Sequence, residues 1–184
     1  MALTKTPICN FGEKAKDFNL KSIENKQISL KDINGENGIL VMFICNHCPY
    51  VKAIIKDLVD DVKFLESLGV KSVGIMSNDI KNYPDDSFEN MISFSKVHGF
   101  SFPYLIDETQ EVAKKYGAVC TPDFFGYNKN LELQYRGRIR ELKDLKPVRT
   151  GDSDLKKAMK LVAETENGPK NQIPSMGCNI KWFK

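Results

Sequence analysis

Long apolar segments are missing from this sequence. A membrane-spanning helix needs about 18 consecutive apolar residues, and no segment approaches that length, nor do residues 1–20 contain an apolar run of signal-peptide length. Blocks of like charge are also missing, because the 27 basic and 24 acidic residues are interspersed and give a net charge of +3. Interspersed charges indicate a solvated surface. We therefore expect a cytoplasmic protein with no nucleic-acid partner and no membrane partner.

The chain also lacks internal repeats, low-complexity tracts, dividing linkers and a glycine-rich phosphate loop. Its 184 residues, of which 41% are hydrophobic and 28% are charged, fit one domain of ordinary size with its own core. After residue 167 the apolar periodicity stops, and glycine and proline punctuate the sequence. We expect one domain over residues 1–167, an irregular C-terminal tail over residues 168–184, and no bound organic cofactor.

The cysteine count excludes one common arrangement. Five cysteines are an odd number in a chain of this size, which argues against the disulfide framework of a small secreted domain. In a reducing compartment, two cysteines close together in sequence indicate metal binding or redox chemistry. One such pair occurs, Cys45 and Cys48 in the segment CNHCP. The other cysteines are Cys9, Cys120 and Cys178.

The cysteine pair falls where a predicted strand is followed by a predicted helix. Residues 38–44, GILVMFI, form a continuous apolar run that is typical of a strand buried on both faces of a parallel sheet. Apolar residues then recur at helical spacing from Pro49 until Gly69. The first turn of a helix has unpaired N–H groups and carries the positive end of the macrodipole. A thiolate is stabilised there, so its pKa can fall from about 8.5 to below neutrality.

Strand and helix patterns alternate along the rest of the domain, which indicates an α/β fold. The strand expected at residues 70–76 would complete a parallel βαβ unit with residues 38–44. The other expected elements are helices at 88–97, 111–116 and 152–166, a strand at 103–106, and a hairpin of 123–128 with 131–136. Candidate helix caps are Asp85, Asp86 and Ser87 for the first of these helices, and Asp107 and Thr109 for the second.

Three roles remain open for the pair on these patterns alone: a structural role, a metal clamp and a redox couple. A zinc site needs about four ligands, which His47, Cys120 and Cys178 would have to complete. His47 lies between the two cysteines in sequence, where reaching the same ion is awkward. The position at a helix start favours redox chemistry and no metal, with a metal-binding or copper-delivery module as the third function considered.

Motifs spread along most of the chain resemble the redoxin group, the alkyl hydroperoxide reductase and thiol-specific antioxidant (AhpC/TSA) relatives of thioredoxin. The resemblance covers roughly residues 12–165, and the combination of CNHCP, VCTPDFF, YRGRI and GCNIKW resembles a peroxiredoxin-like subgroup. It implies a thioredoxin-like α/β fold with a central mixed β-sheet flanked by helices, an N-terminal extension and a C-terminal tail. The matching segments are Gly12–Leu20, Ser29-Leu30, CNHCP, Asp107-Glu108-Thr109, Tyr116-Gly117 and Thr121-Pro122-Asp123-Phe124-Phe125.

The resemblance and the position of the pair together predict the roles of the site residues. Cys45, which we expect to be exposed, attacks a disulfide, and the more buried Cys48 then displaces the mixed disulfide. His47 tunes the couple. The resemblance implies a cis proline at Pro122 that faces the pair, so that the backbone of Thr121 and Pro122 offers a docking edge to a substrate peptide.

Two further cysteines are candidate redox residues. Cys120 is either a small buried apolar residue or, if its side chain turns toward the pair, a third sulfur. Cys178 lies in the predicted tail and is either inert or a resolving thiol that folds back over the pair.

The expected function is that of a thiol–disulfide oxidoreductase. Its partners would be protein or small-molecule disulfides and thiols, with electrons supplied by a cellular thiol reductant. A thiol-dependent hydroperoxide reductase is the alternative. When the peroxiredoxin pattern P-x-x-x-T/S-x-x-C is laid on the chain, its cysteine falls on Cys48, but its hydroxyl residue falls on Cys45 and its proline falls on Val41. With no arginine expected near Pro122, disulfide exchange is favoured over peroxide reduction.

Overall fold

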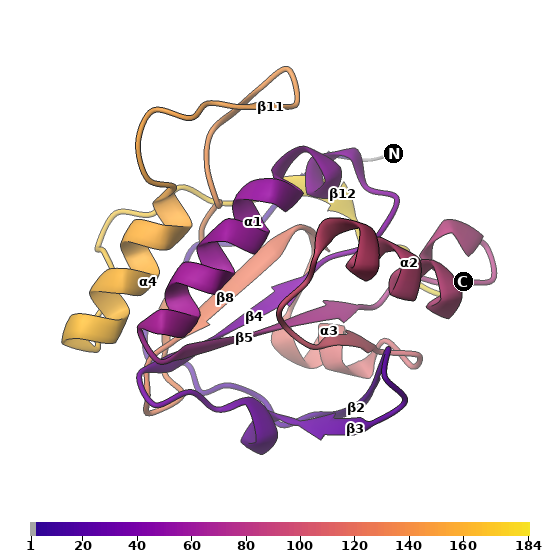
Figure 1. Ribbon diagram of the computed structural model, residues 1–184, viewed down its shortest axis with the longest axis horizontal. Coiled ribbons are helices and arrows are strands. Elements are labelled where there is room, and N and C mark those ends of the chain that lie inside the picture. The colour runs from indigo at the N-terminus through magenta and orange to yellow at the C-terminus, as the bar shows by residue number, and fades with distance from the viewer. Residues whose placement is uncertain (1–2) are drawn as a thin grey trace.

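A seven-stranded mixed sheet forms the centre of the protein in the computed structural model, which describes residues 3–184 (Figure 1). The strand order is β3-β2-β6-β5-β4-β8-β9. Strands β4, β5 and β6 are parallel, and the remaining pairings are antiparallel. The predicted thioredoxin-like α/β class, with a central mixed sheet between helices, is confirmed. The strands are β2 (Asn19–Ser22), β3 (Gln27–Ser29), β4 (Gly38–Phe43), β5 (Val70–Met76), β6 (Tyr104–Ile106), β8 (Asp123–Tyr127) and β9 (Leu133–Tyr135).

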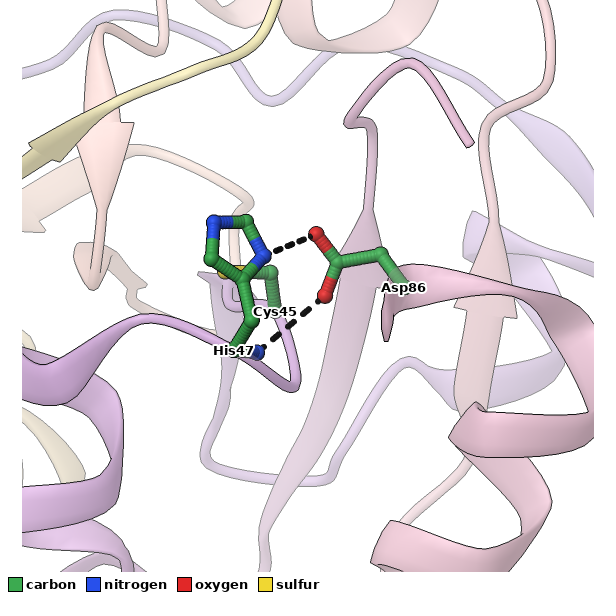
Figure 2. Close-up of side chains that lie close together, drawn as sticks. All are labelled: Cys45, His47 and Asp86. Atoms are coloured by element: carbon green, nitrogen blue, oxygen red, sulfur yellow. Dashed lines mark hydrogen bonds and ion pairs between the residues drawn. The ribbon is translucent and has the colours of Figure 1, made fainter. Parts of the chain in front are cut away.

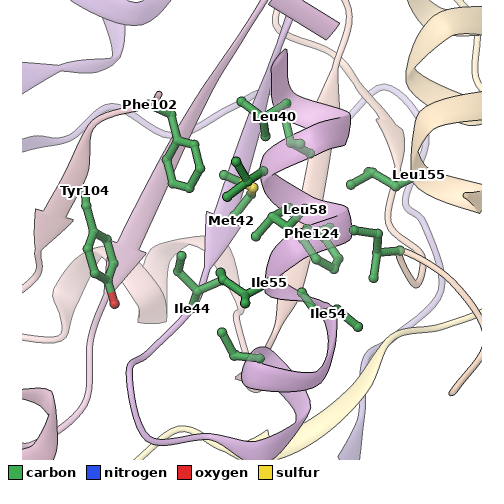
Figure 3. Close-up of a cluster of buried hydrophobic side chains, with 14 of the residues drawn as sticks. Leu40, Met42, Ile44, Ile54, Ile55, Leu58, Phe102, Tyr104, Phe124 and Leu155 are labelled. Atoms are coloured by element: carbon green, nitrogen blue, oxygen red, sulfur yellow. The ribbon is translucent and has the colours of Figure 1, made fainter. Parts of the chain in front are cut away.

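Strand β4 is the middle of the core because every one of its residues is buried. It pairs with β5 from Gly38↔Val70 to Phe43↔Ile75 and with β8 on its other side. Alternate side chains of a strand point to opposite faces, so Leu40 and Met42 enter one apolar cluster while Val41 and Phe43 enter another. Figure 3 shows the first cluster between the sheet and the helix that follows the cysteine pair. This continuous burial holds the end of β4, and with it Cys45, in a fixed position.

Helices cover both faces of the sheet. Apolar residues of α1 (Pro49–Ser67), α2 (Phe88–His98) and α4 (Asp154–Thr165) join the first cluster, and those of α3 (Glu111–Tyr116) join the second. The inward residues predicted for the last helix, Leu155, Ala158, Met159 and Val162, are all buried. Within residues 3–184, no helix combines the length and apolar character that crossing a bilayer requires.

Helix ends follow the residues that the sequence offers for them. Ser87 accepts a hydrogen bond from the backbone of Asn90, which leaves Asp86 outside α2 in the short 3-10 helix η2 (Pro84–Asp86). Gly99 ends α2 with a φ of 66°, a left-handed conformation that glycine adopts without strain. At α3 the carboxylate of Asp107 accepts hydrogen bonds from the amides of Val112 and Ala113, as expected for a capping acid.

The C-terminal segment is not irregular throughout, which corrects the expectation for residues 168–184. Residues Met176–Asn179 form strand β12, which pairs antiparallel with β1 (Leu3–Lys5) and with β7 (Cys120–Thr121). Ile180 is buried, whereas Trp182 remains partly exposed. A four-residue strand containing glycine has no detectable alternation, so its pairing is decided by distant partners. A small hairpin of β10 (Leu142–Lys143) and β11 (Lys146–Pro147) and the 3-10 helix η1 (Leu30–Ile33) complete the fold.

Candidate redox site

The cysteine pair lies in the short connection between β4 and α1, as predicted. Cys48 is the N-cap of α1, and Pro49 occupies the first helical position, where its missing N–H leaves no hydrogen bond unmade. The expectation that Cys45 is exposed is wrong, because its relative accessibility is 1% and that of Cys48 is 0%. Residues of β7 and β12 pack over both sulfurs. No partner molecule can therefore reach either sulfur without a local opening.

The sulfur atoms of the pair contact residues of strands β7 and β12. The Sγ of Cys45 lies 3.3 Å from the hydroxyl of Thr121. The Sγ of Cys48 lies 3.1 Å from the carbonyl oxygen of Thr121 and 3.1 Å from the Sγ of Cys178. The Thr121–Pro122 peptide bond is cis, as the resemblance implied. Thr121 and Cys178, on β7 and β12, thus complete the surroundings of the pair.

The predicted docking edge at Thr121 is already occupied. Cys178 of β12 stands opposite Thr121 in an antiparallel pairing, and Asn179 stands opposite Cys120. A β-carbon built on Gly177 would clash with the carbonyl oxygen of Thr121, so the two backbones are in direct contact. A substrate peptide cannot pair with this edge while β12 remains there. The strand-like recognition expected for Thr121 and Pro122 is made instead by the chain's own C-terminal segment.

The pKa values of the two thiols move in opposite directions. The pKa of Cys48 is lowered to about 5. The largest cause is the hydrogen bond from the thiol of Cys45, which outweighs the opposite effect of burial. The Cys178 thiol and the backbone of Val51 and Cys178 donate further hydrogen bonds that act in the same direction. Burial raises the pKa of Cys45 well above its ordinary value. Burial and the neighbouring Cys48 raise the pKa of Cys178 to about 12. The sulfur prepared as a thiolate is therefore Cys48, where the sequence prediction had named Cys45.

His47 forms an ion pair with an acid that sequence reasoning had assigned only to helix capping. Its Nδ1 lies 2.6 Å from Asp86 Oδ2, and Figure 2 shows the ring turned toward that carboxylate beside Cys45. The hydrogen bond that His47 donates to Asp86 raises the pKa of His47 above its usual value. The ring also stacks on Tyr83, with 5.8 Å between centroids and 9° between planes.

Asp86 holds the loop between the two cysteines. Its side chain is 0% exposed and accepts hydrogen bonds from the amides of Asn46 (2.8 Å) and His47 (3.2 Å) and from the side chain of Asn78 (2.8 Å). Burial opposes its ionisation, but the hydrogen bonds from His47 and Asn78 outweigh burial and lower the pKa of Asp86. His47 and Asp86 are 39 residues apart, and no local pattern connects them. Asp86 is the site residue that the sequence analysis missed, since it was considered only as a helix cap.

One group near the pair has the composition of a metal site. Ligand atoms of Cys45, His47 and Asp86 all lie within 4.8 Å of one another. Both oxygens of Asp86 are already engaged, Oδ1 by two backbone amides and Oδ2 by His47 and Asn78. A structural zinc site takes about four ligands. The three groups therefore fit a hydrogen-bonded positioning network better than a metal centre.

The remaining cysteines lie apart from this chemistry. The Sγ of Cys120 faces the carbonyl oxygen of Pro122 at 3.6 Å, and burial raises its pKa. Cys120 is therefore a small buried residue, which is one of the two roles expected for it. Cys9 is half-buried, and burial raises its pKa to about 11.

Arginines approach Pro122, contrary to the expectation that none would. Arg138 and Arg140 line a cavity of about 500 Å³ that Pro122 and Tyr50 also border. Neither arginine carries a free charge, because Arg138 pairs with an aspartate of α4 at 2.7 Å and Arg140 with one of α1 at 3.1 Å. Arg136 is buried against Asp123 at 3.0 Å. The pairs of Arg138 and Arg140 tie the loop after β9 to α4 and α1 and stabilise one wall of the cavity, whereas the pair of Arg136 joins this loop to β8.

Comparisons with known proteins agree with this fold. The crystal structure of an uncharacterised conserved protein from Geobacillus kaustophilus superposes with a TM-score of 0.94 at 37% identity, covering 100% of this chain and 97% of the other. A Mycobacterium tuberculosis protein named "Putative peroxiredoxin MT2597" is 27% identical over 124 residues, 67% of this chain and 74% of its own. The thiol-disulfide oxidoreductase ResA of Bacillus thuringiensis is 28% identical over 130 residues, 69% of each chain.

The match to a family pattern decides the classification. The AhpC/TSA family pattern matches residues 11–142, which includes β4, the cysteine pair and the cis proline. The match spans most of the chain and is accompanied by a thioredoxin-like fold. The protein is thus a member of the AhpC/TSA family.

Proposed function

We propose that this protein is a thiol–disulfide oxidoreductase that cycles Cys45 and Cys48 between dithiol and disulfide. The observation that carries the proposal is the stabilised thiolate of Cys48 beside a second thiol at a helix start. A thiolate is the nucleophile in disulfide exchange, and a neighbouring thiol ends the mixed disulfide. The family membership and the relative named as a thiol-disulfide oxidoreductase support it. The cytoplasm, with its pool of thiol reductants, is the proposed compartment.

The proposed cycle exchanges one disulfide for another. The Cys48 thiolate attacks one sulfur of a substrate disulfide, and the other sulfur leaves as a thiolate. Cys45 then loses its proton and attacks Cys48, so that the Cys45–Cys48 disulfide forms and the second substrate sulfur leaves and takes up a proton. A cellular thiol reductant restores the dithiol by the reverse exchange. Protein and small-molecule disulfides are the proposed substrates, and either would reach Cys48 only after the local opening that its burial requires.

His47 has a tuning role in this proposal. Its ring is charged over a wider pH range than a free imidazole, because Asp86 raises its pKa. Each thiolate is favoured by a nearby positive charge, whereas a disulfide carries no charge to stabilise. A charged His47 therefore favours the reduced form and makes the couple more oxidising. The reduction potential should become more negative in His47→Ala, and an unchanged potential would remove this role.

Hydroperoxide reduction is the second function considered, and one observation favours it. The lowered pKa belongs to Cys48, the position that aligns with the attacking cysteine of the peroxiredoxin pattern. In that reaction the Cys48 thiolate takes the distal oxygen of a hydroperoxide, the O–O bond breaks, and the products, with one proton taken up from solvent, are a sulfenic acid at Cys48 and the alcohol. A second thiol of the protein then condenses with it to a disulfide and releases water.

The two functions are separated by their substrates. Reduced protein would be tested for insulin-disulfide reduction and for consumption of an alkyl hydroperoxide, each with wild type, Cys48→Ser and Cys45→Ser. Disulfide exchange predicts that the wild type reduces insulin over many turnovers and that neither cysteine variant does. The buried control Cys120→Ala should match the wild type in both assays. Rapid hydroperoxide consumption without insulin reduction would refute the exchange proposal, and a stoichiometric metal in anaerobically purified protein would favour a metal-binding module over both.

A further inference from the structure

Cys178 stands in the position that an incoming sulfur would need to occupy. Strand β12 pairs with β7 so that Cys178 lies opposite Thr121, and its Sγ is 3.1 Å from the Sγ of Cys48. A disulfide bond is about 2.05 Å long, so the two sulfurs would have to approach by only about 1 Å. Cys178 is 4% exposed and belongs to the same apolar cluster as Cys45 and Cys48. Cys48 therefore has two candidate thiol partners, one before it in sequence and one 130 residues after it.

We propose that Cys178 is a third redox cysteine, which exchanges with the Cys45–Cys48 disulfide at Cys48. This inference rests on the proposed thiol–disulfide cycle. The Cys178 thiolate attacks Cys48 Sγ, the Cys48–Cys178 bond forms, the Cys45–Cys48 bond breaks, and Cys45 leaves as a thiolate that takes up the proton released by Cys178. The step is an isomerisation, since one disulfide and one thiol are present before and after it. No external oxidant or reductant is consumed.

The electrostatics of Cys178 change in the direction that the step requires. In the reduced protein, burial and the Cys48 thiolate both raise the pKa of Cys178. When Cys48 enters a disulfide it loses its negative charge, and the contribution of Cys48 disappears. Lys181, which lowers the pKa of Cys178, remains nearby. Cys178 is thus easier to deprotonate in the oxidised protein than in the reduced protein, which restricts its attack to the state in which a disulfide is present.

The exchange also has a consequence for access. In the reduced protein, β12 covers the edge of Thr121 and presents its own cysteine to Cys48, as a bound substrate strand would. The Cys48–Cys178 disulfide would fix β12 in place and leave Cys45 as a thiol. The oxidising equivalent would move from the deeply buried pair to a strand near the C-terminus, whose residue Met176 is partly exposed. The chain's own strand is in this sense an internal substrate of the CxxC pair.

Peptide mapping can distinguish the two disulfides directly. Trypsin leaves Cys45 and Cys48 together in the peptide of residues 32–52 and places Cys178 in the peptide of residues 171–181. A Cys45–Cys48 disulfide is therefore internal to one peptide, whereas Cys48–Cys178 joins two peptides. The protein would be equilibrated in buffers of reduced and oxidised glutathione, alkylated, digested and measured by mass spectrometry.

The proposal predicts a cross-linked peptide pair in oxidised Cys45→Ala, with at least half of Cys48 joined to Cys178, and the same pair at intermediate glutathione ratios in the wild type. Cys120→Ala should match the wild type. Free Cys178 with glutathione attached to Cys48 in Cys45→Ala, together with no cross-link in the wild type at any ratio, would overturn it. The wild-type measurement needs no substitution and so does not depend on the folding of a variant. A different result would refute the underlying thiol–disulfide cycle: the absence of a Cys45–Cys48 disulfide in oxidised Cys178→Ala.

Discussion

Replacing Asp86 by asparagine perturbs the site without changing its shape. Asparagine keeps Oδ1, which accepts hydrogen bonds from the amides of Asn46 and His47. The oxygen Oδ2, which accepts from the His47 ring and from Asn78, becomes an NH2 group that faces another donor at Asn78. A hydrogen bond to a charged group contributes about 1.5–3 kcal/mol net, so the loss of two predicts a decrease of roughly 3–6 kcal/mol in the free energy of unfolding.

The size of this loss should depend on pH. The pKa of His47 is raised in the folded protein, so its contribution is complete below the unfolded value of about 6.5 and is lost as pH rises through the folded pKa. The pKa of Asp86 is lowered, so its contribution is complete above about 3.9 and is lost as pH falls through the folded pKa. The difference between wild type and Asp86→Asn should be largest between about pH 4 and 6.5 and smaller above the folded pKa of His47.

Urea unfolding of the reduced protein at about pH 5.5 and about pH 8.5 measures both effects. Asp85→Asn is the matched control, because Asp85 is exposed and adjacent in sequence, and its side chain takes no part in the network. It should change the free energy of unfolding by less than about 0.5 kcal/mol. A loss of less than about 1 kcal/mol in Asp86→Asn, or an equal loss at both pH values, would refute the role assigned to the His47–Asp86 pair.

Further predictions concern the strand over the site and the core. Gly177→Ala places a methyl group against the carbonyl oxygen of Thr121, so β12 should shift away from β7 and iodoacetamide should alkylate Cys48 at least tenfold faster than in wild type. Cys178→Ala removes the thiol donor to the thiolate but keeps the backbone amide, so the pKa of Cys48, read from thiolate absorbance, should rise above about 5; an unchanged value would contradict the contact. Leu58→Ala, at a fully buried position of α1, should lower the free energy of unfolding by about 2–5 kcal/mol in urea, and a loss below about 1 kcal/mol would contradict the core packing.

The elements that surround the cysteine pair follow from local patterns. The apolar run of residues 38–44 and the helical spacing after Pro49 predict β4 and α1 to within one or two residues of their ends. Residues 70–76 predict β5 with the same bounds. Such signals are readable because burial on both faces, or on one helix face, imposes a period on the sequence.

The parts of the site that local patterns miss depend on distant partners. The carboxylate of Asp86 is usable as a helix cap in sequence, but in the fold Ser87 caps α2, which leaves Asp86 to bind the loop of His47. Strand β12 is four residues long, and its position is set by pairing with β1 and β7. Cys45 is buried rather than exposed for the same reason, because Thr121, whose hydroxyl contacts its sulfur, lies 76 residues away in sequence.

The most direct test of the account is a thiolate titration of the reduced protein. Ultraviolet absorbance of thiolate, followed from about pH 4 to pH 9, should show one transition with a midpoint near 5 that is absent in Cys48→Ser and present in Cys120→Ala. This result would establish Cys48 as the nucleophile that the helix start and the neighbouring thiols stabilise. Absorbance that stays at its acid value until above about pH 8, or a transition that disappears in Cys45→Ser and persists in Cys48→Ser, would contradict it.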